Sequence, residues 1–527
     1  MAQWNKDAQS YDNQSTRHEV YMRSDQYGNI INETATSRSA FGESIAVSIT
    51  PVVQLDGLYG LDSRKFESFD AFGGTVDSTG TLMRCQTGTA QYGYGVLRSR
   101  RAVRYRPGQG ALTRFTAAFT QGTAGYTQRA GFFSQEQALQ IGYNGTSFGI
   151  LRQNEGKAHI EKLVVTGAAS VASDVTITLN GVAYVVPISI DTASINAAEI
   201  SEWFQINATA GWVVEHCDGI VNFLSTSIGV KAGTFSFSAG TTTATATIET
   251  IQTGVADVNN WTTQENWNID TCLGDGPDNG NPSNILLDPT KLNVYQINFR
   301  WLGAGQITYS IEHPDNGEMI AIHKEHYVNT NTTLHLDNPS LKLGYVAASL
   351  GGTGTNVVVT GGSIMGAIEG LIETTNLPTS AAVSIAGSYT TGSLHHALTI
   401  HNRLVFDNKI NTREVLLKEI SAAFRTSPAG QPIEIFVFYN FDDLPSPSVY
   451  NVISSTESSV FYNNTVGTLT LGTNIPIYTF FSSGGESTNL DLEKLRIALP
   501  PNNKITVAFQ STDTVSRASV ALTFIED

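Results

Sequence analysis

Four arginines with alternating spacing are candidates for a binding role. They are Arg98, Arg100, Arg104 and Arg106, all in the segment RSRRAVRYR. If residues 96–106 form one continuous strand, alternation places all four on the same face. Their charges repel one another unless acidic groups lie against them, and guanidinium groups bind carboxylates through paired hydrogen bonds. We therefore expect an interface with carboxylates of this chain or of a neighbouring subunit. A phosphate or a sulfated glycan is the alternative partner.

The loop DGPDNGN at residues 275–281 is a second candidate, because it is rich in oxygen ligands and glycine. Ca²⁺ takes such ligands from loops. Asp275 and Asp278 would be its carboxylate ligands, but the loop lacks the D-x-D-x-D-G order and a closing Glu. The same residue types also form ordinary turns. We therefore predict a turn, no metal site and no cofactor, with Asp275 and Asp278 as the alternative calcium ligands.

Two short motifs do not have the context that catalysis requires. Gly145–Gly149 matches G-x-S-x-G, but a hydrolase elbow needs a strand before the Ser and a helix after it. Here Asn144-Gly145 is a hairpin turn and a strand follows. His323 and His326 lie in an alternating segment, so a strand would point them to opposite faces. We therefore predict a protein that is not an enzyme. A glycan hydrolase stays open as an alternative, because paired carboxylates in one cleft cannot be recognised from the sequence.

Composition favours strands over helices. Charged residues make up 15% of the 527 residues, below the roughly 25% of ordinary globular proteins, and Gly, Thr, Ser and Asn take up the difference. The net charge of −16 argues against broad nucleic-acid binding. The three cysteines form no C-x-x-C pair, so neither a disulfide framework nor a zinc site is expected. No apolar run reaches about 18 residues and no secretory signal is visible, so we expect no membrane insertion.

Hydrophobic alternation and turn signals divide the chain into several β-domains. Asn293–His313 alternates on both sides of a glycine-containing break, as a hairpin does. Residues 58–163 and 254–350 are predicted to be two halves of one β-sandwich. Between them, residues 164–253 contain two strands joined at Asn180-Gly181, a helix near 194–206 and further strands. This pattern predicts an inserted ββαββ domain.

The remaining segments complete the predicted architecture. Residues 1–57 are polar, and we predict an N-terminal docking arm in which Ser44–Val53 adds a strand to another sheet, with Ile45, Val47 and Ile49 facing inward. Residues 351–370 are glycine-rich and are predicted to be a linker, with a loose hairpin as the alternative. Residues 371–527 are predicted to be a C-terminal β-domain. The fold class is therefore mainly β and multidomain: a jelly-roll or concanavalin-like β-sandwich with an inserted small α+β domain and a C-terminal β-domain.

Several segments together resemble a family of virion structural proteins from marine tailed phages, including cyanophages, with relatives in large algal DNA viruses. The strings are AFGE at 40–43, RSRRAVRYRPGQG at 98–110, ENWNID at 265–270 and NVYQINFRWLGAGQITYSIEH at 293–313. The resemblance covers about 37–160, 255–348 and, more loosely, 394–527. Residues 164–253, with TITLNGVAY and KAGTFSFSAG, resemble a small domain that is inserted in phage tail proteins.

This resemblance implies a non-enzymatic structural component of a phage particle, associated with the tail, neck or baseplate and acting through contacts between subunits. The expected location is the virion. The expected partners are other virion proteins and further copies of the chain, with a trimer favoured. The alternatives are a receptor- or glycan-binding appendage that contacts a host surface glycan, a capsid decoration protein, and a tail-associated glycan hydrolase. Neither nucleic acid nor a membrane is expected as a partner.

Overall fold

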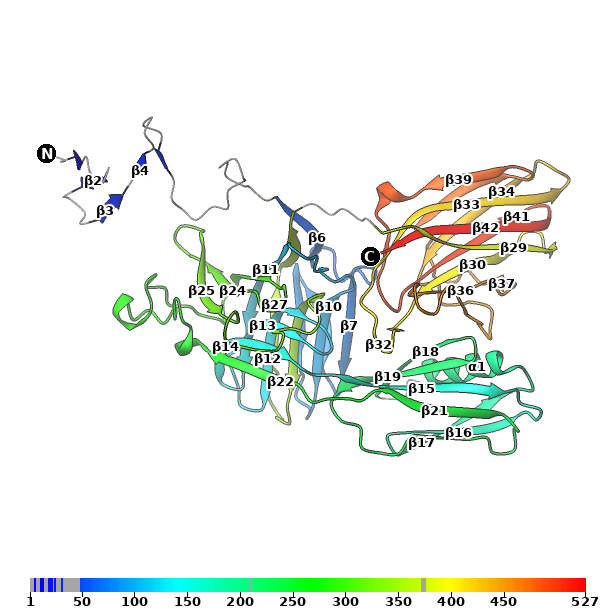
Figure 1. Cartoon of the computed structure of the whole chain (residues 1–527), viewed down its shortest axis with the longest axis horizontal. Coiled ribbons are helices and arrows are strands. Elements are labelled where there is room, and N and C mark those ends of the chain that lie inside the picture. Colours follow the sequence, from blue (N-terminus) through cyan, green and yellow to red (C-terminus); the bar gives the residue numbers. More distant parts are fainter. Residues whose placement is uncertain are drawn as a thin grey trace. The chain divides into compact units, whose positions relative to one another are not determined.

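The computed structural model describes residues 48–207, 211–370 and 376–527, together with the bounds of five short strands nearer the N-terminus (Figure 1). These strands are β1 Trp4–Asn5, β2 Ser10–Asn13, β3 His18–Tyr21, β4 Arg23–Ser24 and β5 Ile30–Ile31. They belong to a first unit, Met1–Ile49, in which β1-β2-β3 form one sheet and β4-β5 another. The second unit is Thr50–Asp527.

The second unit is built almost entirely from antiparallel strands, which confirms the predicted mainly-β, multidomain fold class. Its first domain is a β-sandwich of two sheets. One has seven strands in the order β22-β14-β13-β12-β26-β10-β7. The other has nine, in the order β25-β24-β23-β11-β27-β9-β8, with β28 paired to β11 and β6 paired to β28. Large aromatic side chains, including Phe115, Phe132, Tyr295, Phe299 and Tyr309, fill the space between the sheets.

The strands of the sandwich have the following bounds: β6 Ile49–Asp56, β7 Phe66–Ala71, β8 Thr75–Thr79, β9 Leu82–Gln86, β10 Tyr94–Ser99, β11 Gly110–Phe119, β12 Tyr126–Phe133, β13 Ala138–Asn144, β14 Ser147–Asn154, β22 Val258–Thr263, β23 Asn293–Arg300, β24 Ile307–Glu312, β25 Met319–Glu325, β26 Lys342–Ser349, β27 Val358–Gly361 and β28 Ser363–Glu369. Two short 3₁₀ helices, η1 Gln264–Asn266 and η2 Pro277–Asn279, lie in its loops. The hairpin predicted within Asn293–His313 forms as β23 and β24.

An inserted domain lies between β14 and β22 (cyan to green in Figure 1). It has a four-stranded sheet, β18-β19-β15-β21, a three-stranded sheet, β17-β16-β20, and one helix, α1. The bounds are β15 Ala158–Gly167, β16 Ser173–Leu179, β17 Val182–Ile188, α1 Ala193–Ile206, β18 Trp212–Cys217, β19 Ile220–Ile228, β20 Ser236–Ser238 and β21 Thr245–Gln252. Thr192 caps α1 by accepting a hydrogen bond from the Ile195 N–H. Ile200 and Phe204 lie on the inner face of the helix and are buried in the core of the inserted domain.

The inserted domain starts earlier than predicted. The expected boundary at residue 164 falls inside β15, which pairs with β19 and β21 and so belongs to the insert. Lys157 and Val255 form a two-way backbone bridge where the chain leaves and re-enters the sandwich. The alternation of His159–Leu163 predicts a strand but not its partner, because pairing is a long-range property.

The C-terminal domain has a five-stranded sheet, β29-β42-β33-β39 with β40, and a seven-stranded sheet, β35-β36-β30-β41-β34-β38 with β37. The bounds are β29 Thr379–Tyr389, β30 Leu394–Asn402, β31 Val405–Phe406, β32 Lys409–Ile410, β33 Val415–Ser427, β34 Pro432–Tyr439, β35 Asn451–Val452, β36 Val460–Asn463, β37 Thr468–Leu469, β38 Tyr478–Ser483, β39 Ser487–Asp491, η3 Glu493–Leu495, β40 Ala498–Leu499, β41 Lys504–Ser511 and β42 Thr514–Glu526.

The predicted linker at 351–370 is wrong, because this segment contributes β27 and β28 to the nine-stranded sheet. Val359 and Ile364 are fully buried in the sandwich core. At least one of the glycines is required by close packing: a Cβ on Gly361 would lie 2.2 Å from the Tyr345 hydroxyl. Glycine-rich composition here reflects the approach of a side chain to the backbone, and not flexibility.

The predicted docking arm needs a similar correction at its end. Strand β6 pairs with β28, and its Val53 and Leu55 are buried in the sandwich core, so the last residues of the arm belong to this domain. Ile49, which was expected to face inward, is largely exposed. Residues 44–47 lie outside the described residues. The strand addition therefore takes place within the chain, at the edge formed by β28.

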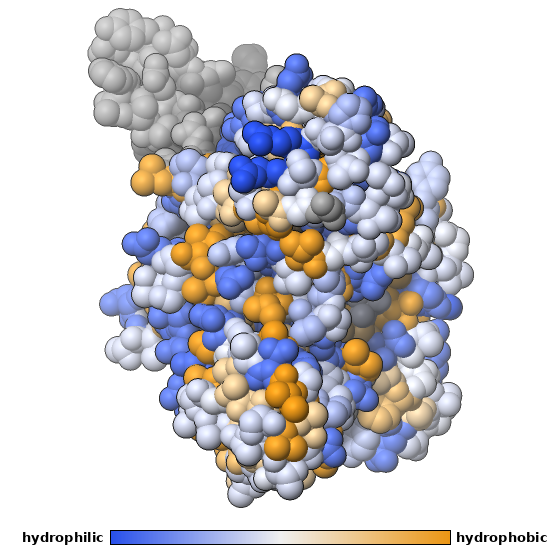
Figure 2. All heavy atoms as spheres, turned by 90° about the vertical axis from the view of Figure 1, so that its right-hand side faces the viewer, coloured by the Kyte–Doolittle hydropathy of each residue, from blue (hydrophilic) through white to orange (hydrophobic). Residues whose placement is uncertain are grey.

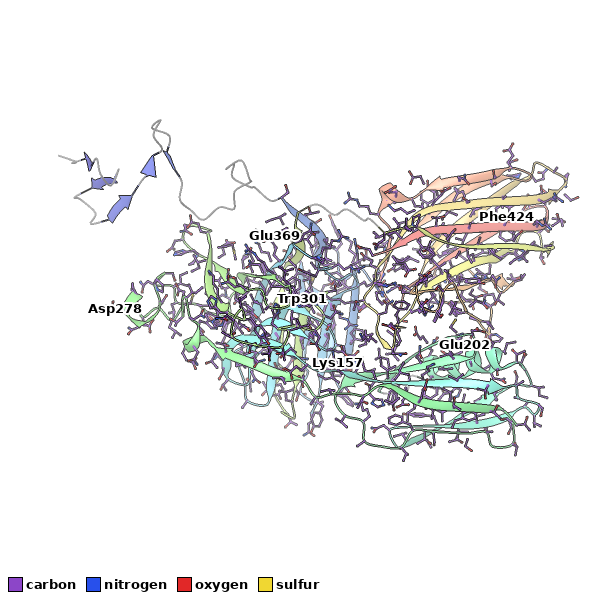
Figure 3. The ribbon with its side chains drawn as sticks, in the orientation of Figure 1. Lys157, Glu202, Asp278, Trp301, Glu369 and Phe424 are labelled. Carbon is purple, nitrogen blue, oxygen red and sulfur yellow. The ribbon has the colours of Figure 1, made fainter. Side chains whose placement is uncertain are left out.

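The insert and the C-terminal domain share a polar junction. Glu202 on α1 accepts hydrogen bonds from the Ser446 hydroxyl and the Ser448 N–H (Glu202 is labelled in Figure 3). Glu215 on β18 accepts hydrogen bonds from the N–H groups of Leu404 and Val405, at the start of the β31–β32 hairpin. These contacts hold the hairpin against β18, and Val405 packs in one cluster with Leu224 of β19.

Candidate functional sites

The arginine segment is not one strand. β10 ends at Ser99, and beyond it only Val103 pairs, through a single bridge to Leu341. The Ser99 hydroxyl donates to the Arg101 carbonyl and accepts from the Leu343 N–H, which turns the chain out of the sheet. The four predicted arginines therefore do not share one strand face.

The arginines nevertheless meet carboxylates of the same chain. Arg98 Nε lies 2.7 Å from Glu67, which also binds the Lys342 ammonium at 2.9 Å. Burial alone would raise the pKa of Glu67, but Lys342 and Arg98 together hold that pKa below its ordinary value. Arg100 is 3.9 Å from the other oxygen of Glu67.

The rest of the segment joins the sandwich to the C-terminal domain. Arg101 binds Glu414 through two hydrogen bonds of 2.7 and 2.8 Å. Arg106 pairs with Asp527, and Arg104 lies 4.0 Å from the same carboxylate. Burial lowers the pKa of Arg101, but the paired contact with Glu414 outweighs this and raises it overall. These pairs agree with the expected carboxylate partners and make the segment an interface between two domains of one chain.

A cleft of about 420 Å³, here called the basic cleft, lies beside this interface. Its floor is apolar and includes Val53, Leu55, Ile477 and Ile497. Five of its described lining residues are basic and none is acidic. These five are Arg64, Lys65, Arg100, Arg101 and Arg496. An apolar floor with a cationic rim suits a small ligand that carries a negative charge.

The basic residues of the cleft differ in how they are compensated. Arg64 pairs with Asp62 at 3.0 Å and Arg101 with Glu414, so these two are neutralised within the fold. Among the described residues, neither Lys65 nor Arg496 has a carboxylate within ion-pair distance, and both are exposed. Arg496 also has a left-handed backbone, with φ of 49°, at the end of η3.

A second feature is a group of exposed aromatic residues, here called the aromatic loop end. Phe72 follows β7 and is 67% exposed, and Tyr92 precedes β10 and is 57% exposed. Their loops touch, because a Cβ on Gly93 would lie 3.0 Å from the Phe72 carbonyl. The Tyr92 N–H donates to Ser349 at the end of β26.

Register places the aromatic loop end away from the basic cleft. In the β7–β10 pair Ala71 lies opposite Tyr94, whereas Phe66 lies opposite Ser99, next to the interdomain arginines. Five strand steps separate these ends, which corresponds to about 17 Å. Both Phe72 and Tyr92 have left-handed backbones, with φ of 52° and 61°. A positive φ is an outlier for a bulky residue and marks a conformation that the surrounding loops must hold.

The other sequence candidates do not assemble into a site. Asp275 and Asp278 are exposed around η2, and Figure 3 shows Asp278 on a loop that projects from the sandwich. No group of three or more His, Cys, Asp or Glu residues within the described part of the chain could hold a metal ion. His323 is buried and accepts from the Asn268 N–H, whereas His326 is exposed. Ser147 opens β14 directly after a hairpin turn and is followed by strand.

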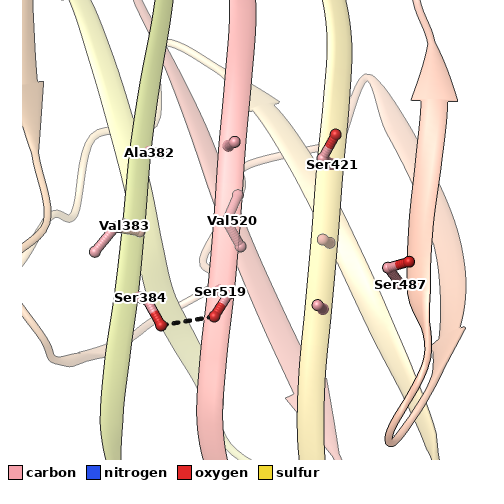
Figure 4. Close-up of a pocket in the computed structure, with 10 residues that line it drawn as sticks. Ala382, Val383, Ser384, Ser421, Ser487, Ser519 and Val520 are labelled. Atoms are coloured by element: carbon pink, nitrogen blue, oxygen red, sulfur yellow. Dashed lines mark hydrogen bonds between the residues drawn. The ribbon is translucent and has the colours of Figure 1, made fainter.

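The outer face of the five-stranded sheet carries a shallow groove of about 470 Å³ lined by small residues (Figure 4). Ser384 and Ser519 share a hydrogen bond of 2.8 Å across β29 and β42. None of the described residues that line the groove is Asp, Glu, His, Lys or Arg. Figure 2 shows hydrophobic residues in small separate groups on the face it presents.

Sequence reasoning missed Lys65, Arg496, Phe72 and Tyr92. The pairs Phe72-Gly73 and Tyr92-Gly93 are a usable signal, since an aromatic residue beside glycine often lies in a turn. Nothing local marks Lys65 and Arg496, because they meet only through the packing of two domains.

Comparisons with known proteins add little. No family model matches the chain, and no curated protein matches it. Similar solved structures include a lectin from Bauhinia forficata in complex with GalNAc (TM-score 0.20, 8% identity, 61% of this chain and 99% of that chain). They also include a legume lectin-like domain from Entamoeba histolytica (0.21, 9%, 57% and 89%) and lectin II from Ulex europaeus (0.21, 8%, 61% and 100%). At these TM-scores the likeness carries no argument about a ligand.

No helix in the described part of the chain has the length and apolar character needed to cross a membrane. The description of the chain as a multidomain antiparallel β-protein with a sandwich rests on its own sheets.

Proposed function

We propose that this chain is a non-enzymatic recognition protein of a virus particle that binds a host surface glycan through its aromatic loop end. The observation that carries the proposal is the exposure of Phe72 and Tyr92 on two touching loops at one end of the sandwich. A sugar ring has a face rich in C–H groups, and such a face packs well against an aromatic ring.

The backbone of these loops supports a binding role. Phe72 and Tyr92 both have positive φ, which costs free energy that their own exposed side chains do not recover by burial. Close contacts hold the loops: a Cβ on Gly74 would lie 2.1 Å from the Tyr94 carbonyl, and one on Gly93 would lie 2.1 Å from the Thr87 carbonyl. Loops whose backbone is held by such contacts before binding lose little entropy when a ligand arrives.

The location in a particle rests on the resemblance of four segments of the chain to virion structural proteins. The proposal therefore makes two claims that can be tested separately: that the aromatic loop end binds a glycan, and that the chain is located in a virus particle. Immunogold labelling of purified particles with an antibody against the chain tests the place. Absence of the label from intact particles would remove that part and leave the site untouched.

Binding to glycans tests the site. Asn replaces each ring without conflict, because Asn tolerates a left-handed backbone. The double variant Phe72→Asn/Tyr92→Asn should lose at least about tenfold of the affinity for glycans that bind the wild type on an array, since each lost ring contact is worth about 1 kcal/mol. Tyr59→Asn is the matched control, because Tyr59 is also exposed but lies in the β6–β7 loop. Equal binding by the double variant and the wild type would refute the site.

A second candidate function is assembly through subunit contacts, as expected for a tail, neck or baseplate component. Strand β7 favours it, because β7 ends the seven-stranded sheet and no strand among the described residues pairs with its outer edge. An open edge can receive a strand from another copy. Ser68→Lys should then reduce oligomerisation measured by light scattering, and Thr473→Lys in a surface turn should not. A monomeric wild-type chain would count against self-assembly.

A further inference from the structure

We infer that the basic cleft is a binding site for a small ligand that carries an oxyanion group, a sulfate or a carboxylate, on a compact apolar or saccharide body. This site lies at the junction of the sandwich and the C-terminal domain and is separate from the aromatic loop end. The inference does not depend on the proposed function.

The charge of the cleft is the first argument. The whole chain has a net charge of −16, yet five basic residues and no acidic residue line this cleft in the described structure. Asp62 neutralises Arg64, and Glu414 neutralises Arg101. Arg100 donates hydrogen bonds to the Ser63 carbonyl and the Asn503 side chain, and it lies 3.9 Å from Glu67, a carboxylate that Arg98 and Lys342 already share.

Two exposed cations without an ion pair support the same inference. Among the described residues neither Lys65 nor Arg496 forms an ion pair, although the charge of Lys65 helps to lower the pKa of Asp62. The two cations come from different domains and line the same cleft. Two such cations attract an oxyanion between them, and a guanidinium binds one through two hydrogen bonds. Low-dielectric walls strengthen this attraction relative to open water.

The backbone of Arg496 is the third argument. Its φ of 49° is unfavourable for a side chain with a Cβ, and glycine is the residue that adopts this conformation at no cost. The Arg496 N–H is hydrogen-bonded to the Glu493 carbonyl at 3.2 Å, so the conformation is defined by the turn that ends η3. An arginine at a position that favours glycine indicates that the guanidinium has a functional role, which offsets the strain in the backbone.

The apolar floor decides the kind of ligand. Val53 and Leu55 reach the cleft from β6, and Ile477 and Ile497 reach it from the C-terminal domain. An inorganic ion alone would gain nothing from these side chains, whereas a ligand with an apolar face would bury them. The cleft volume of about 420 Å³ falls within the range of ordinary small-molecule sites.

Titration calorimetry on the full chain tests the inference with three probes: N-acetylglucosamine 6-sulfate, N-acetylglucosamine and inorganic sulfate. We expect the sulfated sugar to bind more tightly than either of the other two. Its affinity should fall as salt rises from about 50 to about 300 mM, because the Debye length shortens. A neutral sugar or bare sulfate that binds as tightly as the sulfated sugar would overturn the inference, as would the absence of binding by all three.

Two double variants locate the site. Lys65→Gln/Arg496→Gln removes the two uncompensated cations and should weaken binding of the sulfated sugar by at least about tenfold. Lys291→Gln/Arg517→Gln removes two exposed cations elsewhere and should change the affinity less than about twofold. An equal loss in both variants would mean that only overall charge matters and would refute the cleft as the site.

Two further experiments distinguish the basic cleft from the aromatic loop end and a small ligand from residues 1–47 of the chain. The Phe72→Asn/Tyr92→Asn variant should retain binding of the sulfated sugar, because its substitutions lie at the other end of β7 and β10. Loss of binding there would move the site to the aromatic loop end. If an acidic peptide from residues 1–47 of this chain competes with the sulfated sugar and binds more tightly than it does, the occupant is the chain itself and the small-ligand inference fails.

Discussion

Replacing Glu215 by Ala should uncouple the insert from the C-terminal domain. Glu215 is only 2% exposed, and its carboxylate accepts three hydrogen bonds. The Leu404 N–H donates at 2.5 Å, the Val405 N–H at 3.0 Å and the Asn222 amide at 2.9 Å. Burial raises the pKa of Glu215, while these three donors oppose that rise. The Glu215 carboxylate thus accepts hydrogen bonds from both the insert and the C-terminal domain.

The size of the effect follows from the donors left behind. Each buried donor without a partner costs about 1–3 kcal/mol, and removal of the carboxylate also removes the cost of burying it. Asn222 can turn towards other partners, so we count mainly the two backbone N–H groups. The variant should therefore lose about 3 kcal/mol of junction stability, which corresponds to roughly a hundredfold rise in the opening equilibrium of the hairpin.

Hydrogen exchange measured by mass spectrometry reports this directly, because opening exposes the amides of Leu404 and Val405. Peptides that cover β31 and β32 should exchange roughly a hundredfold faster in Glu215→Ala. Glu249→Ala is the control, because Glu249 lies in the same insert and binds Lys162 at the surface. Unchanged exchange at residues 404 and 405 would show that Glu215 does not hold the junction, and the reasoning would be refuted.

Three further predictions test other parts of the structure. Arg496→Gly should raise the free energy of unfolding in urea by about 1 kcal/mol, because glycine adopts the left-handed backbone freely, while weakening binding of the sulfated sugar. Gly361→Ala should destabilise the sandwich by about 2 kcal/mol or more in a thermal melt, because its Cβ would lie 2.2 Å from the hydroxyl of the buried Tyr345. Gly362→Ala is the control and should be nearly neutral in the same melt, because its Cβ would meet no atom closer than 3.4 Å. Burial lowers the pKa of His396 to about 4 from the ordinary 6.5. The unfolded state therefore binds a proton more readily, so the free energy of unfolding is complete above pH 6.5 and falls by about 3 kcal/mol as the pH drops towards 4. Urea titrations between pH 7 and 4 should show a smaller loss of stability in His396→Gln than in the wild type.

Local patterns predicted local structure well. The alternation in Asn293–His313 is set by which side chains a strand buries, and it formed as β23 and β24 with Tyr295 and Phe299 inside. The helix predicted near 194–206 formed as α1, Ala193–Ile206, with Thr192 as its cap. Both signals depend on residues a few positions apart, so the sequence carries them directly.

Long-range pairing could not be predicted in the same way. The glycines of 351–370 look like a linker unless it is known that Tyr345 packs against Gly361. The start of the insert depends on the choice of partner for β15, which takes β19 and β21. The basic cleft likewise unites Lys65 and Arg496, which are far apart in the chain. Such features arise only when segments that are far apart in the chain pack together.

Charge compensation proved a stronger constraint on the arginine segment than strand geometry. β10 ends at Ser99, so the expected strand face does not exist, yet Arg98 and Arg106 still meet carboxylates. A partly buried guanidinium without a partner costs more than a bend in the backbone, so the fold supplies a carboxylate to Arg98, Arg101 and Arg106. This rule does not reach Lys65 and Arg496, because water solvates exposed cations at little cost. Stability therefore does not require these two to face one cleft, and this is why we assign them to a ligand.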